Sequence, residues 1–494
     1  MLIGDGLWHW ARLQPGRTAI RCGDRTWSYG ALANRVRAVA VGLGSHLEGR
    51  RTSPVALLVS DQAELLPWFL AIVEAGGVAA PLNPSWTNAE LALALEVLQP
   101  DLVLTERPIR DCPVPVVLLD ELDPGRRGPV EPNLGGREVG DLGTDPSSPF
   151  YIGFTSGSTG APKGVVRSHR AWVNSFFAMS LEFGIGRDDA VVVPGSLYFS
   201  FSLIAALHAL FIGATVVLLP KPDPRSLLTV LESTPSTVYL LPSVLNELVR
   251  LAERKGVLLP RVGRIICAGE KLSPDTKQCV TRVCPGAALY EYYGASELGY
   301  VSVLGPEDHD RRPDSVGRPF IGTRVAVLDE EGRPVPAGEI GLLCAQTEYG
   351  FSGYWRCPDL DDWVEHFGWR TAGDLARQDS EGFLSLVGRR DNMVVIRGEN
   401  VYPEEVETVI ASLPGVTRAV VLAEPQESPT HLVAVVQTAT PGLEAERILR
   451  HCRVRLSARK TPRRVVLVPD LPTTATGKLA RERVRDFLRR ADHS

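Results

Sequence analysis

Lysine is scarce in this sequence of 494 residues. Seven of its 53 basic side chains are lysines and 46 are arginines, and 58 acidic side chains bring the net charge to −5. This balance gives no reason to expect nucleic acid as a partner. Because lysines are so few, two that lie among glycines and hydroxyl side chains, Lys163 and Lys478, stand out as candidates for contact with an anion.

Paired cysteine motifs are also missing. The eight cysteines include no C-x-x-C pair, which argues against a zinc site and against a disulfide framework. We therefore expect reduced thiols. The first residues, "MLIGDGLWHWARLQPG", lack a basic segment followed by a long apolar one. We therefore expect a cytoplasmic protein and not a secreted one.

No apolar run is long enough to span a membrane without interruption. The longest, "LIAALHALFIGATVVLLP" at 203–220, contains His208 and is broken at Gly213. These two residues favour a buried helix followed by a strand over a membrane span.

Apolar segments with helical and strand-like spacing alternate along most of the chain. They predict strands at 54–60, 190–195 and 263–270 and a helix at 64–77, an order typical of an α/β layered fold. Residues 121–149 form a connector rich in proline, glycine and charge. After about residue 320 the strands shorten and turns become frequent, which predicts a β-rich part. From about residue 390 to the end, a compact α+β unit is expected.

Residues 151–166, "YIGFTSGSTGAPKGVV", concentrate glycine and hydroxyl side chains around Lys163. A flexible linker has this composition, but so does a loop that wraps phosphate with main-chain N–H groups, hydroxyls and a lysine. The Walker version of such a loop is excluded, because its spacing differs and Pro162 keeps Ala161 out of the helical region. A nucleotide bound here would be held by another design.

Four further segments follow in order. They are "YEYYGASE" (290–297), "GWRTAGDLA" (368–376), "GRRDNMVVIRGENVYPEEVE" (388–407) and "LPTTATGKLARE" (471–482). With the loop at 151–166, they make the whole chain resemble the adenylate-forming superfamily of acyl-CoA synthetases, firefly luciferases and peptide-synthetase adenylation domains. The resemblance implies a large N-terminal domain, residues 1–389, and a small mobile C-terminal domain, residues 390–494. It also implies activation of a carboxylic acid by ATP with Mg²⁺.

The resemblance assigns most nucleotide contacts to the N-terminal domain. It places Tyr293 against adenine, Ser296 near the α-phosphate and Glu297 on Mg²⁺, with Glu297 counted among the catalytic residues. Asp374 and Arg389 are placed at the ribose, although Ala372 stands where the family usually has threonine. The remaining residues matched to the nucleotide are Thr155, Ser156, Gly157, Ser158, Thr159, Gly160, Lys163, Gly269 and Gly294.

A swing of the small domain is implied as well. Asp391 matches the hinge, Lys478 the catalytic lysine of the adenylating pose, and Gly398 a residue beside the pantetheine tunnel of the thioester-forming pose.

The acid is expected to be fatty or aryl. Tyr198, Phe199 and Phe201 align with the family's acid pocket, and no acidic residue between Val191 and Pro220 could pair with an α-ammonium group. The segment "RGENVYPEEVE" resembles CoA ligases for fatty and aryl acids more than amino-acid adenylation domains, which implies CoA as the acceptor. A stand-alone enzyme that loads the phosphopantetheine of a carrier protein is the alternative, and an inactive nucleotide-binding relative is a third. The oligomeric state, monomer or homodimer, stays open.

Overall fold

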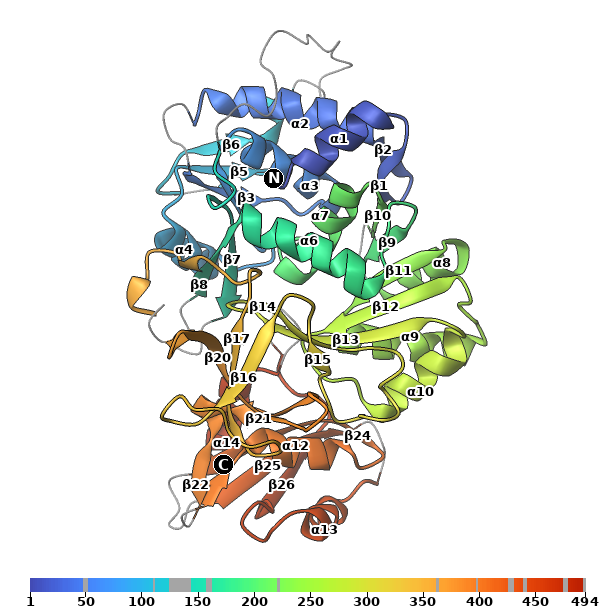
Figure 1. Ribbon diagram of the computed structural model, residues 1–494, viewed down its shortest axis with the longest axis vertical. Helices are drawn as coiled ribbons and strands as arrows, with labels where there is room; N and C mark the ends of the chain where they lie inside the picture. The colour runs from blue at the N-terminus through green and yellow to red at the C-terminus, as the bar shows by residue number, and fades with distance from the viewer. Residues whose placement is uncertain are drawn as a thin grey trace.

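The computed structural model describes residues 1–47, 52–109, 112–123, 144–156, 162–219, 223–360, 364–396, 399–424, 431–438, 442–473 and 479–491. Figure 1 shows a long molecule in which the chain runs from an N-terminal part at one end to a C-terminal part at the other. The prediction of an α/β fold with a large N-terminal and a small C-terminal domain is confirmed.

Two large sheets form the N-terminal part. The nine-stranded sheet has the order β15-β14-β13-β12-β11-β9-β10-β1-β2, and its strands are β1 (Thr18–Cys22), β2 (Arg25–Ser28), β9 (Ala190–Val193), β10 (Thr215–Leu218), β11 (Ser236–Leu240), β12 (Val262–Ala268), β13 (Ala288–Ala295), β14 (Gly299–Leu304) and β15 (Arg318–Pro319). The seven-stranded sheet has the order β18-β8-β7-β4-β3-β5-β6, and its strands are β3 (Pro54–Leu58), β4 (Val78–Pro81), β5 (Leu102–Thr105), β6 (Val116–Leu118), β7 (Pro149–Ser156), β8 (Pro162–Ser168) and β18 (Gly353–Tyr354).

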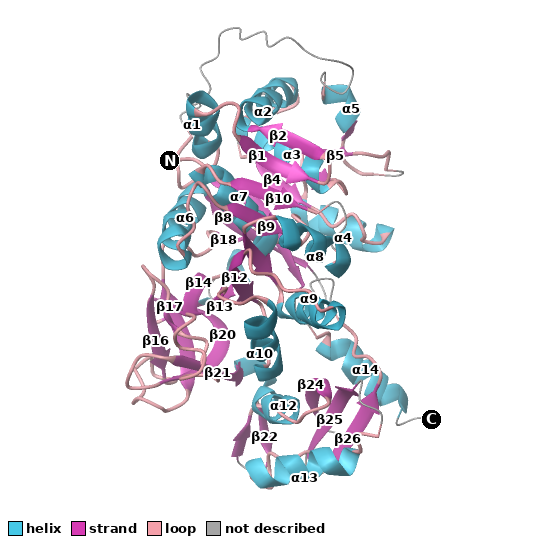
Figure 2. Cartoon of the chain, turned by 90° about the vertical axis from the view of Figure 1, so that its right-hand side faces the viewer, coloured by secondary structure: helices cyan, strands magenta, loops and turns pink. Residues whose placement is uncertain are grey.

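The helices of this part lie on the faces of the two sheets (Figures 1 and 2). They are α1 (Asp5–Leu13), α2 (Tyr29–Gly44), α3 (Gln62–Glu74), α4 (Asn88–Leu98), α5 (Leu119–Leu122), α6 (His169–Phe183), α7 (Ser200–Ile212), α8 (Pro224–Ser233), α9 (Pro242–Lys255) and α10 (Pro274–Val283). Among the described residues, no helix combines the length and the apolar character that a membrane crossing requires.

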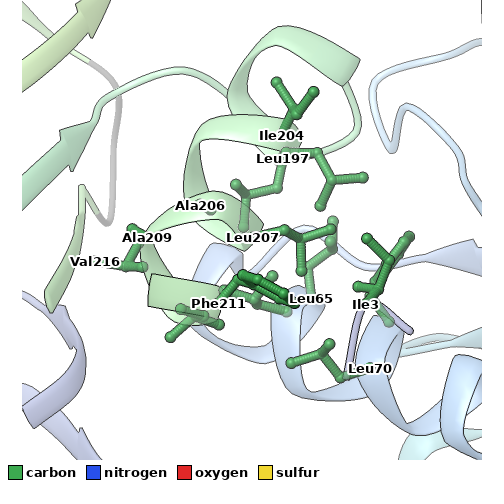
Figure 3. Close-up of a cluster of buried hydrophobic side chains, with 14 of the residues drawn as sticks. Ile3, Leu65, Leu70, Leu197, Ile204, Ala206, Leu207, Ala209, Phe211 and Val216 are labelled. Atoms are coloured by element: carbon green, nitrogen blue, oxygen red, sulfur yellow. The ribbon is translucent and has the colours of Figure 1, made fainter. Parts of the chain in front are cut away.

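One hydrophobic core joins the two sheets. Successive strand residues point to opposite faces, so Val191 of β9 enters this shared core while Val192 enters a second core with α8, α9 and α10. On the other sheet, Val55 enters the shared core and Ala56 packs toward α4. Helices α3 and α7 contribute many of the buried side chains of the shared core, and Figure 3 shows part of their contact.

The predicted helix and strand at 203–220 are α7 and β10. Gly213 ends the helix with a φ of +87°, and a Cβ at this position would lie 2.4 Å from the ring of Trp10. His208 is fully buried, its Nε2 lies 2.9 Å from the hydroxyl of Ser180, and burial lowers the pKa of His208 to about 3. A neutral histidine therefore fits inside this apolar helix.

The β-rich part and the C-terminal part follow. The first contains β16 (Arg324–Leu328), β17 (Gly341–Gln346), β19 (Glu365–His366), β20 (Trp369–Gln378) and β21 (Leu384–Arg389), with a short 3-10 helix at Pro358–Leu360. After a 3-10 helix at Arg390–Asn392, the C-terminal part contains β22 (Val394–Ile396), β23 (Glu399–Val401), α12 (Pro403–Ala411), β24 (Val416–Glu424), β25 (His431–Thr438), α13 (Ala445–Arg455), β26 (Arg464–Val468) and α14 (Arg481–Ala491). Helices α12 and α13 cover one face of the β24-β25-β26 sheet, and α14 covers the other.

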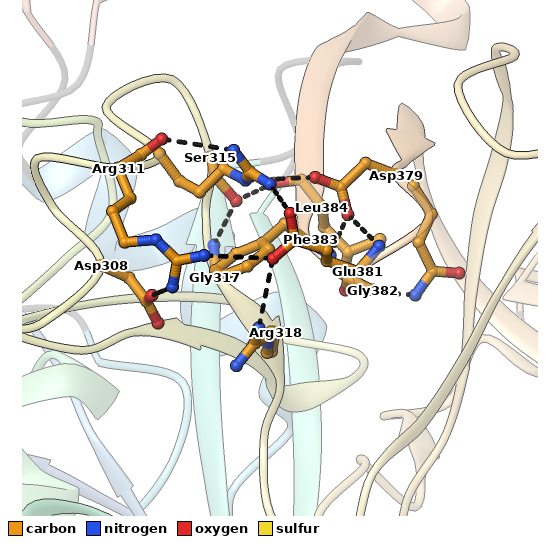
Figure 4. A network of polar contacts seen from close by, with 12 residues as sticks. Asp308, Arg311, Ser315, Gly317, Arg318, Asp379, Glu381, Gly382, Phe383 and Leu384 are labelled. Carbon is orange, nitrogen blue, oxygen red and sulfur yellow. Dashed lines mark hydrogen bonds and ion pairs between the residues drawn. The ribbon is translucent and has the colours of Figure 1, made fainter.

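Hydrogen bonds around Gly317 attach the β-rich part to the nine-stranded sheet (Figure 4). The amide of Leu384 donates to the carbonyl of Gly317 at 2.8 Å, and the hydroxyl of Ser315 donates to the carbonyl of Leu384 at 2.6 Å. Gly317 has a φ of +92°, and a Cβ there would lie 1.8 Å from the carbonyl oxygen of Val303. The junction therefore depends on a residue without a side chain.

We expect Gly317→Ala to lower the melting temperature more than Gly286→Ala does. Gly286 also has a positive φ, +83°, but a Cβ there would meet nothing within 4 Å. Both variants carry the cost of a left-handed alanine, about 1 to 2 kcal/mol, and only Gly317→Ala adds a backbone clash. Thermal unfolding of the two variants measures the difference, and equal melting temperatures would contradict the prediction.

Candidate functional site

The segment around Lys163 is a β-hairpin. Strands β7 and β8 pair in antiparallel fashion, with Thr155 opposite Lys163 and Ser156 opposite Pro162. Lys163 therefore lies on a strand, whereas a Walker loop would open a helix at this point. The predicted phosphate contacts Gly157, Ser158, Thr159 and Gly160 lie outside the described residues, and the side chains of Thr155 and Ser156 are not described either.

Three side chains from distant segments meet beside this hairpin. The Nζ of Lys163 lies 5.5 Å from the centre of the Tyr354 ring, and the Tyr354 hydroxyl donates to Oε1 of Glu297 at 2.6 Å. Tyr354 reaches this place because β18 pairs with β8, with Tyr354 opposite Val165. The sequence did not indicate Tyr354, since an aromatic residue in a turn-rich segment resembles any packing residue.

Arg167 holds the segment that carries Ser296 and Glu297. Its guanidinium donates to the carbonyl of Ser296 at 2.6 Å and to the carbonyl of Tyr349 at 2.6 Å. Burial lowers the pKa of Arg167 to about 10, and the charge of Glu297 opposes that shift, so the guanidinium stays protonated at neutral pH. Arg167 was also missed from the sequence, because its partners are backbone atoms far along the chain.

Glycines shape the backbone around the predicted nucleotide residues. A Cβ on Gly294, near the end of β13, would lie 2.3 Å from the carbonyl oxygen of Gly299, so the turn toward β14 can close tightly only with glycine. Gly269 follows β12 with a φ of +100°, a left-handed conformation that glycine adopts at little cost. Ser296 and Glu297 lie in the turn after Gly294, and both are half-buried.

Tyr293, Asp374 and Arg389 form a hydrogen-bonded group. The Tyr293 hydroxyl donates to Oδ2 of Asp374 at 2.5 Å, and Nε of Arg389 lies 3.1 Å from Oδ1. Asp374 and Arg389 are opposite each other in the β20-β21 pair. Burial, with the nearby Asp374 charge, raises the pKa of Tyr293 well above its ordinary value, which keeps the hydroxyl a donor. Arg389 also donates to the carbonyl of Ala372. Ala372 is buried, and it is the residue that stands where threonine was expected.

The predicted acid-pocket residues lie at the start of α7. Tyr198, Phe199 and Phe201 are all half-buried, and the rings of Tyr198 and Phe199 lie 4.4 Å apart. The preceding turn is fixed by the amide of Leu197, which donates to Oε1 of Gln62 at 2.7 Å. The Phe201 ring lies 6.3 Å from the ring of Tyr292, so this aromatic group reaches β13, the strand that also carries Tyr293 on its opposite face.

The C-terminal domain contacts the large domain near the end of β12, next to Gly269. Arg418 of β24 lies 3.7 Å from Glu270, the residue after Gly269. Asp391 is exposed in the short 3-10 helix before β22, and its neighbour Asn392 donates to Oε1 of Glu404 at 2.6 Å. Gly398 and Lys478 lie outside the described residues.

The side chains of Glu297 and Lys163 fit a nucleotide bound together with Mg²⁺. Among the described residues, no group of three or more histidine, cysteine or acidic side chains could hold a metal by itself. Glu297 offers one carboxylate, linked to Lys163 through Tyr354, and Mg²⁺ is commonly held by one or two carboxylates together with substrate phosphates. The lysine supplies positive charge on the same side, as polyphosphate binding requires.

Comparison with known proteins agrees with this geometry. Residues 7–355 match the model of the family described as AMP-binding enzyme, and residues 405–478 match the AMP-binding enzyme C-terminal domain. An uncharacterized acyl–CoA ligase of Bacillus subtilis (strain 168) is 34% identical, with 97% of this chain and 96% of that protein covered. A 3-hydroxybenzoate–CoA ligase of Aromatoleum sp. (strain CIB) is 29% identical, with 99% and 96% covered. The crystal structure of ATP-bound MatB from Rhodopseudomonas palustris superposes with a TM-score of 0.85 at 25% identity, with 99% of both chains covered.

We expect Tyr354→Phe to raise the Mg²⁺ concentration needed for half-maximal activity about tenfold. The change keeps the ring near Lys163 but removes the hydrogen bond to the Glu297 carboxylate, a bond to a charged group that contributes about 1.5 to 3 kcal/mol. Pyrophosphate exchange into ATP, titrated with Mg²⁺, measures the effect. Tyr29→Phe is the control, because the Tyr29 hydroxyl donates to backbone carbonyls of Leu210 and Ala214 within the core. An unchanged Mg²⁺ dependence in Tyr354→Phe would contradict the assignment.

Proposed function

Since the chain belongs to the family of AMP-binding enzymes, we propose that it joins an aromatic carboxylic acid to CoA by way of an acyl-adenylate. It is an AMP-forming acid–thiol ligase that uses ATP, Mg²⁺ and CoA. The observation that carries the residue assignments is that Lys163 and Glu297 both approach Tyr354, which brings a cation and a carboxylate to the same tyrosine beside the glycine-rich hairpin.

In the first half-reaction, a carboxylate oxygen of the acid attacks the α-phosphorus of ATP, and the bond to pyrophosphate breaks. Negatively charged groups approach one another throughout, so stabilising the anions is the main task. In our proposal Lys163 and the hairpin loop hold the β- and γ-phosphates, and the hydroxyl of Ser296 donates to the α-phosphate. Glu297 would hold Mg²⁺, which when bound neutralises phosphate charge.

We propose that Asp374 and Arg389 bind the ribose hydroxyls and that the Tyr293 ring stacks on adenine. The carboxylate of Asp374 is held in place from both sides, by the Tyr293 hydroxyl and by Arg389. Such a fixed, ionised acceptor suits two neighbouring hydroxyl donors. The exposed backbone at Gly269 and Gly294 lets a ligand approach closely at the same end of the sheet.

In the second half-reaction, the thiol attacks the acyl carbon and AMP leaves. We propose that the domain of residues 390–494 turns about Asp391 between the two steps, bringing Lys478 to the acid and α-phosphate first and opening a thiol path beside Gly398 afterwards. The exposure of Asp391 in a short 3-10 helix supports a hinge there. We place the reaction in the cytoplasm, where ATP and CoA are both available.

Three observations support an aromatic acid as the substrate. Tyr198, Phe199 and Phe201 offer aromatic surface at the start of α7, and burying an apolar group contributes about 0.8 kcal/mol per methylene. Without an acidic residue between 191 and 220, an α-ammonium group would lack a counter-ion in this segment. The similarity to a 3-hydroxybenzoate–CoA ligase points in the same direction.

Pyrophosphate exchange with matched acids tests the substrate class. We expect exchange with 3-phenylpropanoate to exceed that with phenylalanine by at least a hundredfold, because an unpaired ammonium group costs several kcal/mol on burial. Octanoate separates aryl from fatty acids, and a preference for octanoate would overturn the aromatic assignment. Turnover with free CoA against that with a pantetheine-loaded carrier protein identifies the acceptor.

Lys478→Ala should separate the two half-reactions. If Lys478 acts only while the adenylate forms, its loss raises that barrier by about 3 kcal/mol or more, whereas thioester formation from supplied acyl-adenylate continues at a near-normal rate. Rapid-quench measurement of each step gives the two rates. Lys255→Ala, which removes an exposed lysine at the end of α9, is the control and should leave both rates unchanged. Loss of both steps in folded Lys478→Ala would contradict the two-pose assignment.

A further inference from the structure

The turn after β12 presents the carboxylate of Glu270 to the C-terminal domain, and both chain segments beside Glu270 are anchored in the large domain. The amide of Leu272 donates to Oε2 of the buried Glu291 at 2.8 Å. The Nζ of Lys271 donates to the carbonyl of Ser315 at 3.0 Å. Glu270 therefore has a fixed position at the surface of the large domain.

Arg418 reaches this turn from the C-terminal domain. Its Nη2 lies 3.7 Å from Oε2 of Glu270, and the two side chains are only 21% and 31% exposed. Partly buried charges are screened by salt less than fully exposed ones. Arg418 is also held by a sheet, because it lies opposite Gln437 in the pairing of β24 with β25. The ion pair thus joins two rigid segments that belong to different domains.

The face of the small sheet that carries Arg418 is the face that α14 covers. Successive strand residues point to opposite faces, and alternate residues of β24 after Arg418 pack under α14. Hydrogen bonds from Thr87 lower the pKa of Glu90 on α4, and the charge of Arg483 near the start of α14 lowers it further. Helix α4 packs against β7 and β8, the strands of the glycine-rich hairpin. The start of α14 therefore lies on the hairpin side of the large domain.

We propose that Glu270 and Arg418 are positioning residues for the first half-reaction, because their ion pair holds the C-terminal domain in the pose that forms the acyl-adenylate. The inference rests on the proposed function, since it assumes that this domain turns between two poses. Helix α14 begins three residues after Lys478, and in the present pose its start lies on the side where the phosphates of ATP would bind. A turn of the domain moves β24 away from the turn after β12, so the ion pair breaks before the thiol attacks.

Reversing one charge of the pair tests the proposal. Arg418→Glu places two carboxylates together, and we expect it to slow adenylate formation about fivefold in single-turnover rapid-quench measurements. The probes are 3-phenylpropanoate, ATP and Mg²⁺. The KM for ATP should stay unchanged, because the proposed contacts to phosphates, ribose and adenine lie in the large domain. Thioester formation from supplied 3-phenylpropanoyl-adenylate and CoA should be as fast as in the wild type or faster, whereas general damage to the domain would slow both steps.

Exchanging the two charges supplies the rescue. Glu270→Arg alone should slow adenylate formation as Arg418→Glu does, and the double variant should return to within about twofold of the wild-type rate. Glu270 follows Gly269, so this recovery separates the effect of the ion pair from any direct effect on the nucleotide. The control is Arg453→Glu, which breaks a 2.8 Å ion pair with Glu446 inside α13 and should leave both half-reactions unchanged.

An unchanged rate of adenylate formation in Arg418→Glu, or a double variant as slow as the single ones, would overturn the proposal. Slower thioester formation with normal adenylate formation would overturn it as well, because the pair would then belong to the other pose. If a reversed charge prevents folding, Arg418→Gln and Glu270→Gln replace it, and their double variant should be no slower than either single one. A wild-type enzyme that forms no adenylate from 3-phenylpropanoate or octanoate would instead refute the proposed function.

Discussion

The two hydrogen bonds of Arg167 are the contact on which the geometry of the site depends. The guanidinium extends from β8 of the seven-stranded sheet to the carbonyl of Ser296 beyond β13 of the nine-stranded sheet, and to the carbonyl of Tyr349 near the β-rich part. A planar guanidinium has its donors in fixed directions, so it can set the relative positions of three backbone segments. A lysine at this position could not serve both carbonyls with the same rigidity.

The residues that we propose for the two ends of a nucleotide belong to different parts of the framework. Lys163 and Glu297 both approach Tyr354 where the two large sheets meet, whereas Asp374 and Arg389 belong to the β-rich part. The hydroxyl of Tyr293 connects the two, because it extends from β13 to Asp374 of β20. Charged groups are thus fixed by neighbouring hydroxyls and backbone atoms before any ligand arrives, which limits the reorganisation that binding requires.

Local sequence patterns predicted most of the framework and fewer of the contacts in the site. Buried elements such as β3, β9 and α3 carry nearly continuous apolar residues, so their existence follows from the sequence, and Gly213 marks the end of α7. The two-residue strand β18 has no such pattern, since it exists only through its pairing with β8. Arg167 was missed for a related reason, because its acceptors lie 129 and 182 residues away. The roles of the motif residues came from a family resemblance, which local periodicity cannot supply.

The pairing of β18 with β8 has a consequence for the order of folding during synthesis. The indole of Trp355, directly after β18, donates to the carbonyl of Leu98, 257 residues earlier, and its amide donates to Gly164. Until the ribosome has released this segment, β8, the second strand of the glycine-rich hairpin, has an uncovered edge, and uncovered edges invite pairing with other chains. A nascent chain that stops before β18 therefore exposes an edge through which it can aggregate.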